Sequence, residues 1–202
     1  MEKVRSVIFD WGGVLIEDPG PPMMRYCAGV LGVAEAGFAE AVRKFASDFR
    51  KGLVEERVFW ERVCGELGAA VPKDGSLWGA AFRAVYQPME QMWRLVENVR
   101  AGGIATALLS NTEAPAAEFF NEQGYNCFDA VVFSCMEGTK KPERQIYELT
   151  LERLGCQAGE AFFIDDHPLC VEGAAAVGLR AVLFENIGQV KAELARVGIR
   201  AD

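Results

Sequence analysis

The chain has 202 residues, of which 50% are hydrophobic and 25% are charged, as in ordinary globular proteins with a core of conventional size. Its net charge of −8 at pH 7 argues against nucleic acid as a partner, because a phosphate backbone is bound through an excess of Lys and Arg. No stretch reaches the ~18 apolar residues of a membrane helix, and the N-terminal segment turns acidic too early for a signal peptide, so we expect a cytoplasmic protein without a membrane partner.

The first predicted element is a buried strand. Residues 4–9 form a short apolar run that stops at Asp10, as an interior strand of a parallel sheet does. Gly12 and Gly13 follow directly, and glycine permits the backbone angles and the close ligand approach of a tight loop. The Pro and Gly residues of positions 18–22 then break the chain.

Residues 23–86 have a helical pattern and no strand pattern. Apolar side chains recur at three- and four-residue spacing, as at Phe38 and Val42, which is the period of an amphipathic helix. We therefore interpret residues 19–86 as a helical subdomain inserted after the first strand.

The remainder of the chain alternates between helix and strand. The pattern predicts, in order, helix 89–100, strand 104–109, strand 130–133, helix 142–154, strand 161–164, helix 171–177, strand 180–184 and helix 189–197. Strands that alternate with helices predict the α/β class, with a parallel sheet and helices on both of its faces. Residues 1–18 and 87–202 would together form this core domain.

Polar residues follow three of the predicted strands at the points where these strands end. Asp10 follows the first strand, Ser110 and Asn111 follow the second, and Asp165 and Asp166 follow strand 161–164. Parallel sheets bind ligands at the carboxyl ends of their strands. We therefore expect these residues to form one site.

The three carboxylates are suited to the hydrolysis of a phosphate monoester. Asp10 is the candidate nucleophile, because a carboxylate can attack phosphorus and form an aspartyl phosphate that water later hydrolyses. Its attack on a doubly charged ester requires a cation between the two anions. Asp166, and less directly Asp165, are suited to hold Mg²⁺, which prefers oxygen ligands.

The other polar residues are suited to bind the phosphate. Ser110 and the backbone amides near Asn111 are candidate hydrogen-bond donors, and a lysine can supply the fixed positive charge. Lys141 is a better candidate for this lysine than Lys140, because Pro142 restricts the backbone of the residue that precedes it.

Each of these residues also has a purely structural interpretation. Ser110, Asn111 and the threonine after them are good helix caps, although capping and phosphate binding use the same open amides and are compatible. The two acidic residues at 165 and 166 would be favourable at the start of a helix. Lys141 could be a solvated surface lysine.

Four segments resemble the ordered motifs of the haloacid dehalogenase superfamily. They are Val-Ile-Phe-Asp10-Trp-Gly-Gly-Val, Leu-Leu-Ser110-Asn111-Thr, Lys141-Pro-Glu and Phe-Phe-Ile-Asp165-Asp166. The resemblance spans residues 6–166 and implies a Rossmann-like core with a helical cap inserted after the first motif. It also implies a phosphatase that acts on a small phosphorylated metabolite with Mg²⁺ as its cofactor.

Carried over residue by residue, the resemblance assigns a role to each candidate. Asp10 would be the nucleophile and a Mg²⁺ ligand, with the backbone carbonyl of Gly12 and the carboxylate of Asp166 as further ligands and Asp165 in support. The residues that bind the transferring phosphate would be Ser110, Asn111 and Lys141.

The sequence departs from the common family pattern at two positions. Gly12 stands where most of these phosphatases carry a general acid, and Cys170 stands where relatives often have Asp or Asn. Asp-x-Gly-Gly-Val resembles the branch with sugar-1-phosphate phosphatases and epoxide-hydrolase-related phosphatase domains, so a sugar phosphate is the favoured substrate. The two alternatives are a metal-independent haloacid dehalogenase and a catalytically weak binding or regulatory protein of the same fold.

Overall fold

The computed structural model describes residues 3–200 and contains a five-stranded parallel sheet. The strands are β1 (Ser6–Phe9), β2 (Ala105–Ser110), β3 (Ala130–Phe133), β4 (Ala161–Asp165) and β5 (Arg180–Leu183). Their order across the sheet is β3-β2-β1-β4-β5, and each neighbouring pair is parallel. The predicted α/β class with a Rossmann-like sheet is therefore confirmed.

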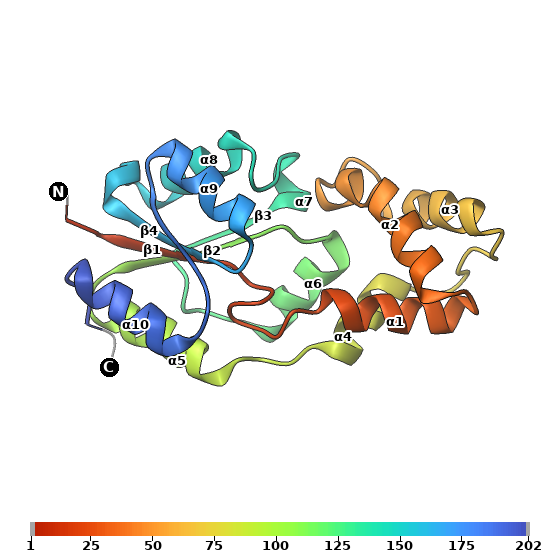
Figure 1. The fold of residues 1–202 in the computed structure, drawn as a ribbon, viewed down its shortest axis with the longest axis horizontal. Helices are drawn as coiled ribbons and strands as arrows, with labels where there is room; N and C mark the ends of the chain where they lie inside the picture. The colour runs from red at the N-terminus through yellow and green to blue at the C-terminus, as the bar shows by residue number, and fades with distance from the viewer. Residues whose placement is uncertain (1–2, 201–202) are drawn as a thin grey trace.

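The strands are apolar on both faces because helices cover both faces. Along β1, Val7 and Phe9 belong to one apolar cluster and Ile8 to the other, as the two-residue period of a strand requires. The first face is covered by α5 (Glu90–Ala101), α6 (Ala114–Gln123) and α10 (Ile187–Arg196), and the second by α8 (Arg144–Leu154) and α9 (Pro168–Val177). Figure 1 shows the sheet between these two layers.

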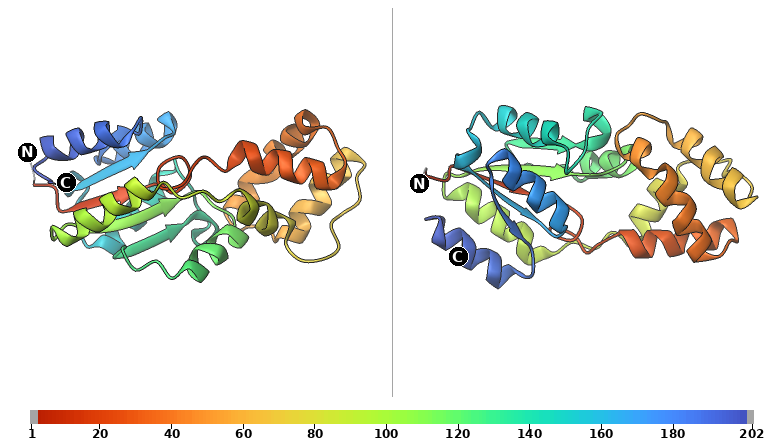
Figure 2. Two further views of the ribbon diagram at one scale, coloured as in Figure 1. Left: turned by 90° about the horizontal axis from the view of Figure 1, so that it is seen from below. Right: turned by 45° about the horizontal axis from the view of Figure 1, so that its top comes forward.

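A group of four helices lies beyond the carboxyl ends of the strands, at the opposite end of the molecule from the chain termini (Figures 1 and 2). These helices are α1 (Gly20–Leu31), α2 (Glu35–Arg50), α3 (Glu56–Leu67) and α4 (Leu77–Val85). Their interior is aromatic, and the rings of Phe49 and Phe59 stack with centroids 4.4 Å apart. We refer to α1–α4 as the cap helices.

Two short connecting segments join the cap helices to the core, and they run side by side. The backbone N–H of Glu17 donates to the carbonyl of Gln87 over 2.9 Å, and that of Met89 donates to Leu15 over 2.9 Å. This pairing lies at the limits inferred for the helical subdomain, residues 19–86. The division into two domains remains an interpretation.

The predicted helix at residues 142–154 was placed two residues too early. Helix α8 begins at Arg144, because the Glu143 N–H donates to the Lys140 carbonyl over 2.8 Å and so closes a turn that contains Pro142. Two short helices were not specified in advance, namely α6 and α7 (Ser134–Glu137). Among residues 3–200, no helix combines the length and apolar character that a membrane crossing needs.

Candidate active site

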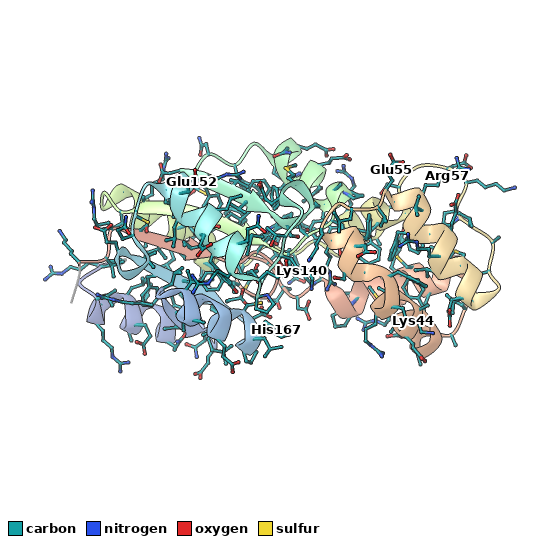
Figure 3. All side chains as sticks on the ribbon, turned by 90° about the horizontal axis from the view of Figure 1, so that it is seen from above. Lys44, Glu55, Arg57, Lys140, Glu152 and His167 are labelled. Atoms are coloured by element: carbon teal, nitrogen blue, oxygen red, sulfur yellow. The ribbon has the colours of Figure 1, made fainter. Side chains whose placement is uncertain are left out.

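The residues expected to act together, except the fully buried Asp165, line one cavity between the sheet and the cap helices. Its volume is about 280 Å³, and its lining from the core includes Asp10, Ser110, Asn111, Lys141 and Asp166. Figure 3 shows Lys140 and His167 on the side of the core that faces the cap helices. A larger hollow of about 680 Å³ lies elsewhere, next to the exposed ion pair of Arg100 and Asp129. That hollow contains none of the candidate residues.

Asp10 lies where β1 ends and is almost entirely buried, with 9% of its surface exposed. Its backbone N–H continues the sheet by donating to the Ile164 carbonyl over 2.9 Å. Its Oδ1 accepts from the backbone N–H of Trp11 and lies 2.7 Å from Lys141 Nζ. Burial raises the pKa of this carboxyl to about 8, although the nearby Lys141 ammonium opposes the increase.

Lys141 is 2% exposed, and its ammonium is held by three acceptors. Nζ lies 2.7 Å from Asp10 Oδ1, 2.7 Å from Asp165 Oδ2 and 2.9 Å from the Leu109 carbonyl. Burial lowers the pKa of the ammonium, but the attraction of the two carboxylates outweighs it and raises that pKa above its ordinary value. Because an ammonium has three N–H groups, Lys141 must release one of these acceptors to donate to a phosphate.

Asn111 holds the backbone of Lys141 instead of pointing its side chain toward a ligand. Its Nδ2 donates to the Lys141 carbonyl over 2.9 Å, and its Oδ1 accepts from the Lys141 N–H over 2.8 Å. A phosphate-binding role for Asn111 is therefore left to its backbone amide. Ser110 ends β2, is buried, and lines the cavity beside it.

Three carboxylates are close enough to share a cation. Oxygen atoms of Asp10, Asp165 and Asp166 all lie within 4.8 Å of one another. Both oxygens of Asp165 are already bonded, one to Lys141 and one to the backbone N–H of His167. Asp166 is the exposed member, and partial burial together with the Asp165 charge raises the pKa of its carboxyl.

Gly13 makes room for one of these carboxylates. Its φ is +79°, and a Cβ at this position would lie 2.2 Å from Asp166 Oδ2, so both the backbone angle and the space require glycine. Oxygen ligands of this kind are those that Mg²⁺ prefers, and the cluster has more carboxylates than ammonium groups. The donor set therefore fits Mg²⁺, with Gly12 in the same cavity wall.

A second charged contact, not anticipated from the sequence, joins the core to the cap helices. Glu113 is 6% exposed. Its Oε1 accepts from Arg50 Nε and its Oε2 from Trp78 Nε1, each over 3.0 Å. The hydroxyl of Ser134 donates to the Arg50 carbonyl over 2.6 Å. Glu113 directly follows the Ser110 motif, and this position could have indicated that it lies near the site. Nothing near Arg50 or Trp78 in the sequence indicates that Glu113 is their partner.

Cys170 and His167 also line the cavity. Burial raises the pKa of the Cys170 thiol to about 12, so this thiol is protonated at neutral pH. The Cys170 backbone carbonyl accepts a hydrogen bond from the Tyr147 hydroxyl over 2.7 Å. His167 immediately precedes α9, and its backbone N–H is bonded to Asp165. The imidazole of His167 is thus a further polar group of the cavity in addition to the expected residues.

Comparison with known proteins agrees with this geometry. The family described as haloacid dehalogenase-like hydrolase matches residues 4–178. Acyl-CoA dehydrogenase family member 10 of Mus musculus is 31% identical over 193 residues, which are 90% of this chain and 18% of that protein. Sesquiterpene phosphatase astK of Aspergillus oryzae is 31% identical over 119 residues, which are 56% of this chain and 61% of that protein. The chain thus spans less than two thirds of either relative.

A solved structure shows the same fold. The HAD family enzyme of Bacteroides thetaiotaomicron, in complex with magnesium and inorganic phosphate, superposes with a TM-score of 0.72. It is 21% identical in sequence, and the match covers 93% of this chain and 98% of that one.

Proposed function

The chain belongs to the haloacid dehalogenase-like hydrolases, and from this premise we propose that it is a Mg²⁺-dependent phosphatase of small phosphate monoesters. One observation carries the proposal: the buried Asp10 carboxylate lines a cavity, bonded to Lys141 and within 4.8 Å of the carboxylates of Asp165 and Asp166. The names of the relatives and the magnesium and phosphate in the B. thetaiotaomicron enzyme support it.

Asp10 is the nucleophile in this proposal. Its carboxylate attacks phosphorus, the bond from phosphorus to the ester oxygen breaks, and the alcohol leaves after taking a proton from solvent. Water then attacks the aspartyl phosphate, which releases inorganic phosphate and restores the carboxylate. Because Asp10 is anchored at the end of a buried strand, its oxygen keeps a fixed position through both steps.

Lys141 favours the ionised form of Asp10 and holds its side chain in place before the attack. The ammonium opposes the effect of burial on the Asp10 carboxyl, and Asn111 holds the backbone that carries it. When a phosphate enters, Lys141 exchanges its bond to Asp10 for one to a phosphate oxygen. Ser110 and the Asn111 amide donate to the other oxygens of the phosphate.

The metal ligands in this proposal are the carboxylates of Asp10 and Asp166 and the backbone carbonyl of Gly12. Asp165 orients the site through its bonds to Lys141 and to the His167 amide. When bound, Mg²⁺ would neutralise charge on the ester and so permit an anion to attack it. The sugar phosphate favoured by the sequence remains one candidate within the class of small monoesters.

A substrate panel with two metal conditions tests the proposal. The purified chain is assayed on phosphate monoesters and on 2-haloacids, with Mg²⁺ and with a chelator. We expect turnover of phosphate monoesters that depends on Mg²⁺, and a phosphorylated Asp10 peptide in acid-quenched samples. Metal-independent release of halide would instead assign a dehalogenase. Absence of both activities in the folded, Mg²⁺-loaded chain would favour a binding or regulatory protein.

A further inference from the structure

The cavity has two walls of different chemistry. The core wall carries the charged groups already described, namely Asp10, Lys141 and Asp166. The wall formed by the cap helices is lined by six residues, of which only Arg50 is charged: Gly20, Met23 and Met24 from α1, Arg50 from α2, and Trp78 and Phe82 from α4. A phosphate held at Asp10 would place its ester group against this second wall.

The two polar side chains of the cap wall, Arg50 and Trp78, both bond to one carboxylate of the protein. Arg50 donates through Nε to Glu113, and Trp78 donates through its indole N–H to the same carboxylate. The negative charge of Glu113 therefore balances the positive charge of Arg50. The same carboxylate accepts the hydrogen bond of the Trp78 indole N–H. Met23, Met24 and Phe82 have no hydrogen-bonding hydrogen to offer.

The apolar side chains are held in a fixed arrangement. The Phe82 ring lies 5.0 Å from that of Trp11, and the Trp78 ring lies 5.4 Å from that of Phe59, measured between centroids. Met24 is half-buried and is the flexible member of the wall, because an unbranched thioether adapts to the shape of its neighbour. The wall thus offers shape and apolar contact to a ligand.

These observations disfavour a hydroxyl-rich ester group. Each hydroxyl that leaves water without a new partner carries a desolvation cost, and the cap wall offers few partners. An aliphatic or aromatic group loses no hydrogen bonds there and gains contact with Met and aromatic side chains.

We propose that the substrate of this site is the phosphate monoester of a small apolar alcohol or phenol. Met23, Met24, Trp78 and Phe82 are the residues that determine this specificity. The inference rests on the proposed phosphatase function. Within that function it favours apolar esters over the sugar phosphates that the sequence favoured. The volume of about 280 Å³ leaves space for the phosphate and one short chain or single ring.

The test compares n-hexyl phosphate with glucose 6-phosphate. Both are esters of primary alcohols with six carbon atoms, so they differ chiefly in the hydroxyl groups of the organic part. Acetyl phosphate serves as a small reference substrate that does not reach the cap wall. We expect kcat/KM for hexyl phosphate to exceed that for glucose 6-phosphate by at least ~10-fold.

Two variants test whether the cap wall causes this substrate preference. Met24→Gln, which keeps the side-chain length and adds a polar amide, is expected to reduce the hexyl-to-glucose ratio several-fold, mainly through a higher KM for hexyl phosphate. Met136→Gln is the matched control, because Met136 is 60% exposed on α7 and does not line the cavity. That control is expected to leave the ratio unchanged.

The possible failures are distinguishable. Mg²⁺-dependent hydrolysis of acetyl phosphate with equal or faster turnover of glucose 6-phosphate than of hexyl phosphate would overturn the inference and leave the phosphatase function standing. If no ester is hydrolysed, the phosphatase function fails. Calorimetric binding of the two esters to the Mg²⁺-loaded Asp10→Asn chain then decides the inference: equal affinities, or tighter binding of glucose 6-phosphate, would overturn it.

Discussion

The core wall and the cap wall of the cavity are stabilised in different ways. In the core wall, Lys141 and Asp165 are almost fully buried, and each is bonded to partners that are themselves charged or part of the backbone. The cap wall consists of methionine and aromatic side chains around a single ion pair, Arg50 with Glu113. A buried charge that loses its partner is costly, whereas apolar walls tolerate substitutions of similar volume. Mutations in the core wall should therefore have large effects and those in the cap wall small ones.

Asp10→Asn is expected to have the largest effect. An amide cannot attack phosphorus, so kcat should fall by at least ~10³-fold while the chain remains folded. Asp129→Asn is the control, because Asp129 is an aspartate of an exposed ion pair far from the cavity lining. Steady-state kinetics and circular dichroism of both variants test this. Substantial activity in a folded Asp10→Asn chain would remove Asp10 as nucleophile.

Lys141→Met should lower the free energy of unfolding by about 3–5 kcal/mol, because two buried carboxylates lose the ammonium between them. The pKa of Asp10, about 8 in the wild-type chain chiefly because of burial, rises further in this variant. A carboxyl whose folded pKa exceeds its unfolded value of about 3.9 destabilises the fold as it ionises. From about pH 4 to 8 this effect lowers stability equally in both chains, so the extra loss of the variant should grow as pH rises above about 8.

Urea titrations from about pH 4 to about pH 10, in the presence of a chelator, measure the effect. Lys140→Met is the matched control, since Lys140 is the adjacent lysine and is only half-buried. We expect the control to change stability by no more than ~0.5 kcal/mol. An equal loss in both variants would show that the ammonium between the carboxylates has no special role.

Asp166→Ala should weaken Mg²⁺ binding more than Asp165→Ala does. Asp166 offers an exposed carboxylate to the cation, whereas both oxygens of Asp165 are bonded to the protein. Loss of a supporting residue typically costs ~10–100-fold in metal affinity, and loss of a direct ligand should cost more. Mg²⁺ titration by calorimetry tests the order, and a larger effect of Asp165→Ala would reverse the two assignments.

Gly12 should make turnover sensitive to the leaving group, because it has no side chain to protonate the departing oxygen. General acids contribute ~10²–10⁴-fold, so among apolar esters aryl phosphates should react faster than alkyl phosphates, and among sugar esters 1-phosphates faster than 6-phosphates. Gly12→Asp should narrow this gap. A Cβ at this position would lie 3.2 Å from Pro19 Cδ, which requires a shift of a few tenths of an ångström.

The measurement is kcat/KM for esters graded by leaving-group acidity, at one Mg²⁺ concentration. A flat dependence in the wild-type chain, with chemistry rate-limiting, would mean that another group supplies the proton. The imidazole of His167, which lines the cavity, would then be tested by substitution with Gln.

Glu113→Gln is expected to have the smallest effect of the five, a ~3–10-fold decrease in kcat/KM. The substitution weakens the contact of Arg50 and Trp78 with the core, and charged partners roughly double the strength of such hydrogen bonds. Glu122→Gln is the matched control, because Glu122 also joins the core to the cap helices through Arg83, but both side chains are about half exposed. Exposed pairs contribute little, so kcat/KM of the control should stay within about twofold.

The sequence by itself determined the fold class and the set of reacting residues. Apolar runs that end at Asp10, Ser110 and Asp165 mark strand ends, and parallel strands bring their carboxyl ends to one edge of the sheet. These three residues, separated by up to 155 positions, could therefore be assigned to one place by local patterns alone: Asp10 and Ser110 line the cavity, and Asp165 lies within 4.8 Å of Asp10.

Only the tertiary structure decided which partner each of these residues has. The bonding of Asn111 to the Lys141 backbone, the three acceptors of Lys141, and the contact of Arg50 with Glu113, 63 positions away, depend on how loops turn and how helices rotate against the core. The start of α8 at Arg144 instead of Pro142 follows a local turn whose Lys141 backbone is bonded to the distant Asn111. Hydrophobic periodicity specifies which face of an element is buried, but it carries no information about which distant side chain meets that face.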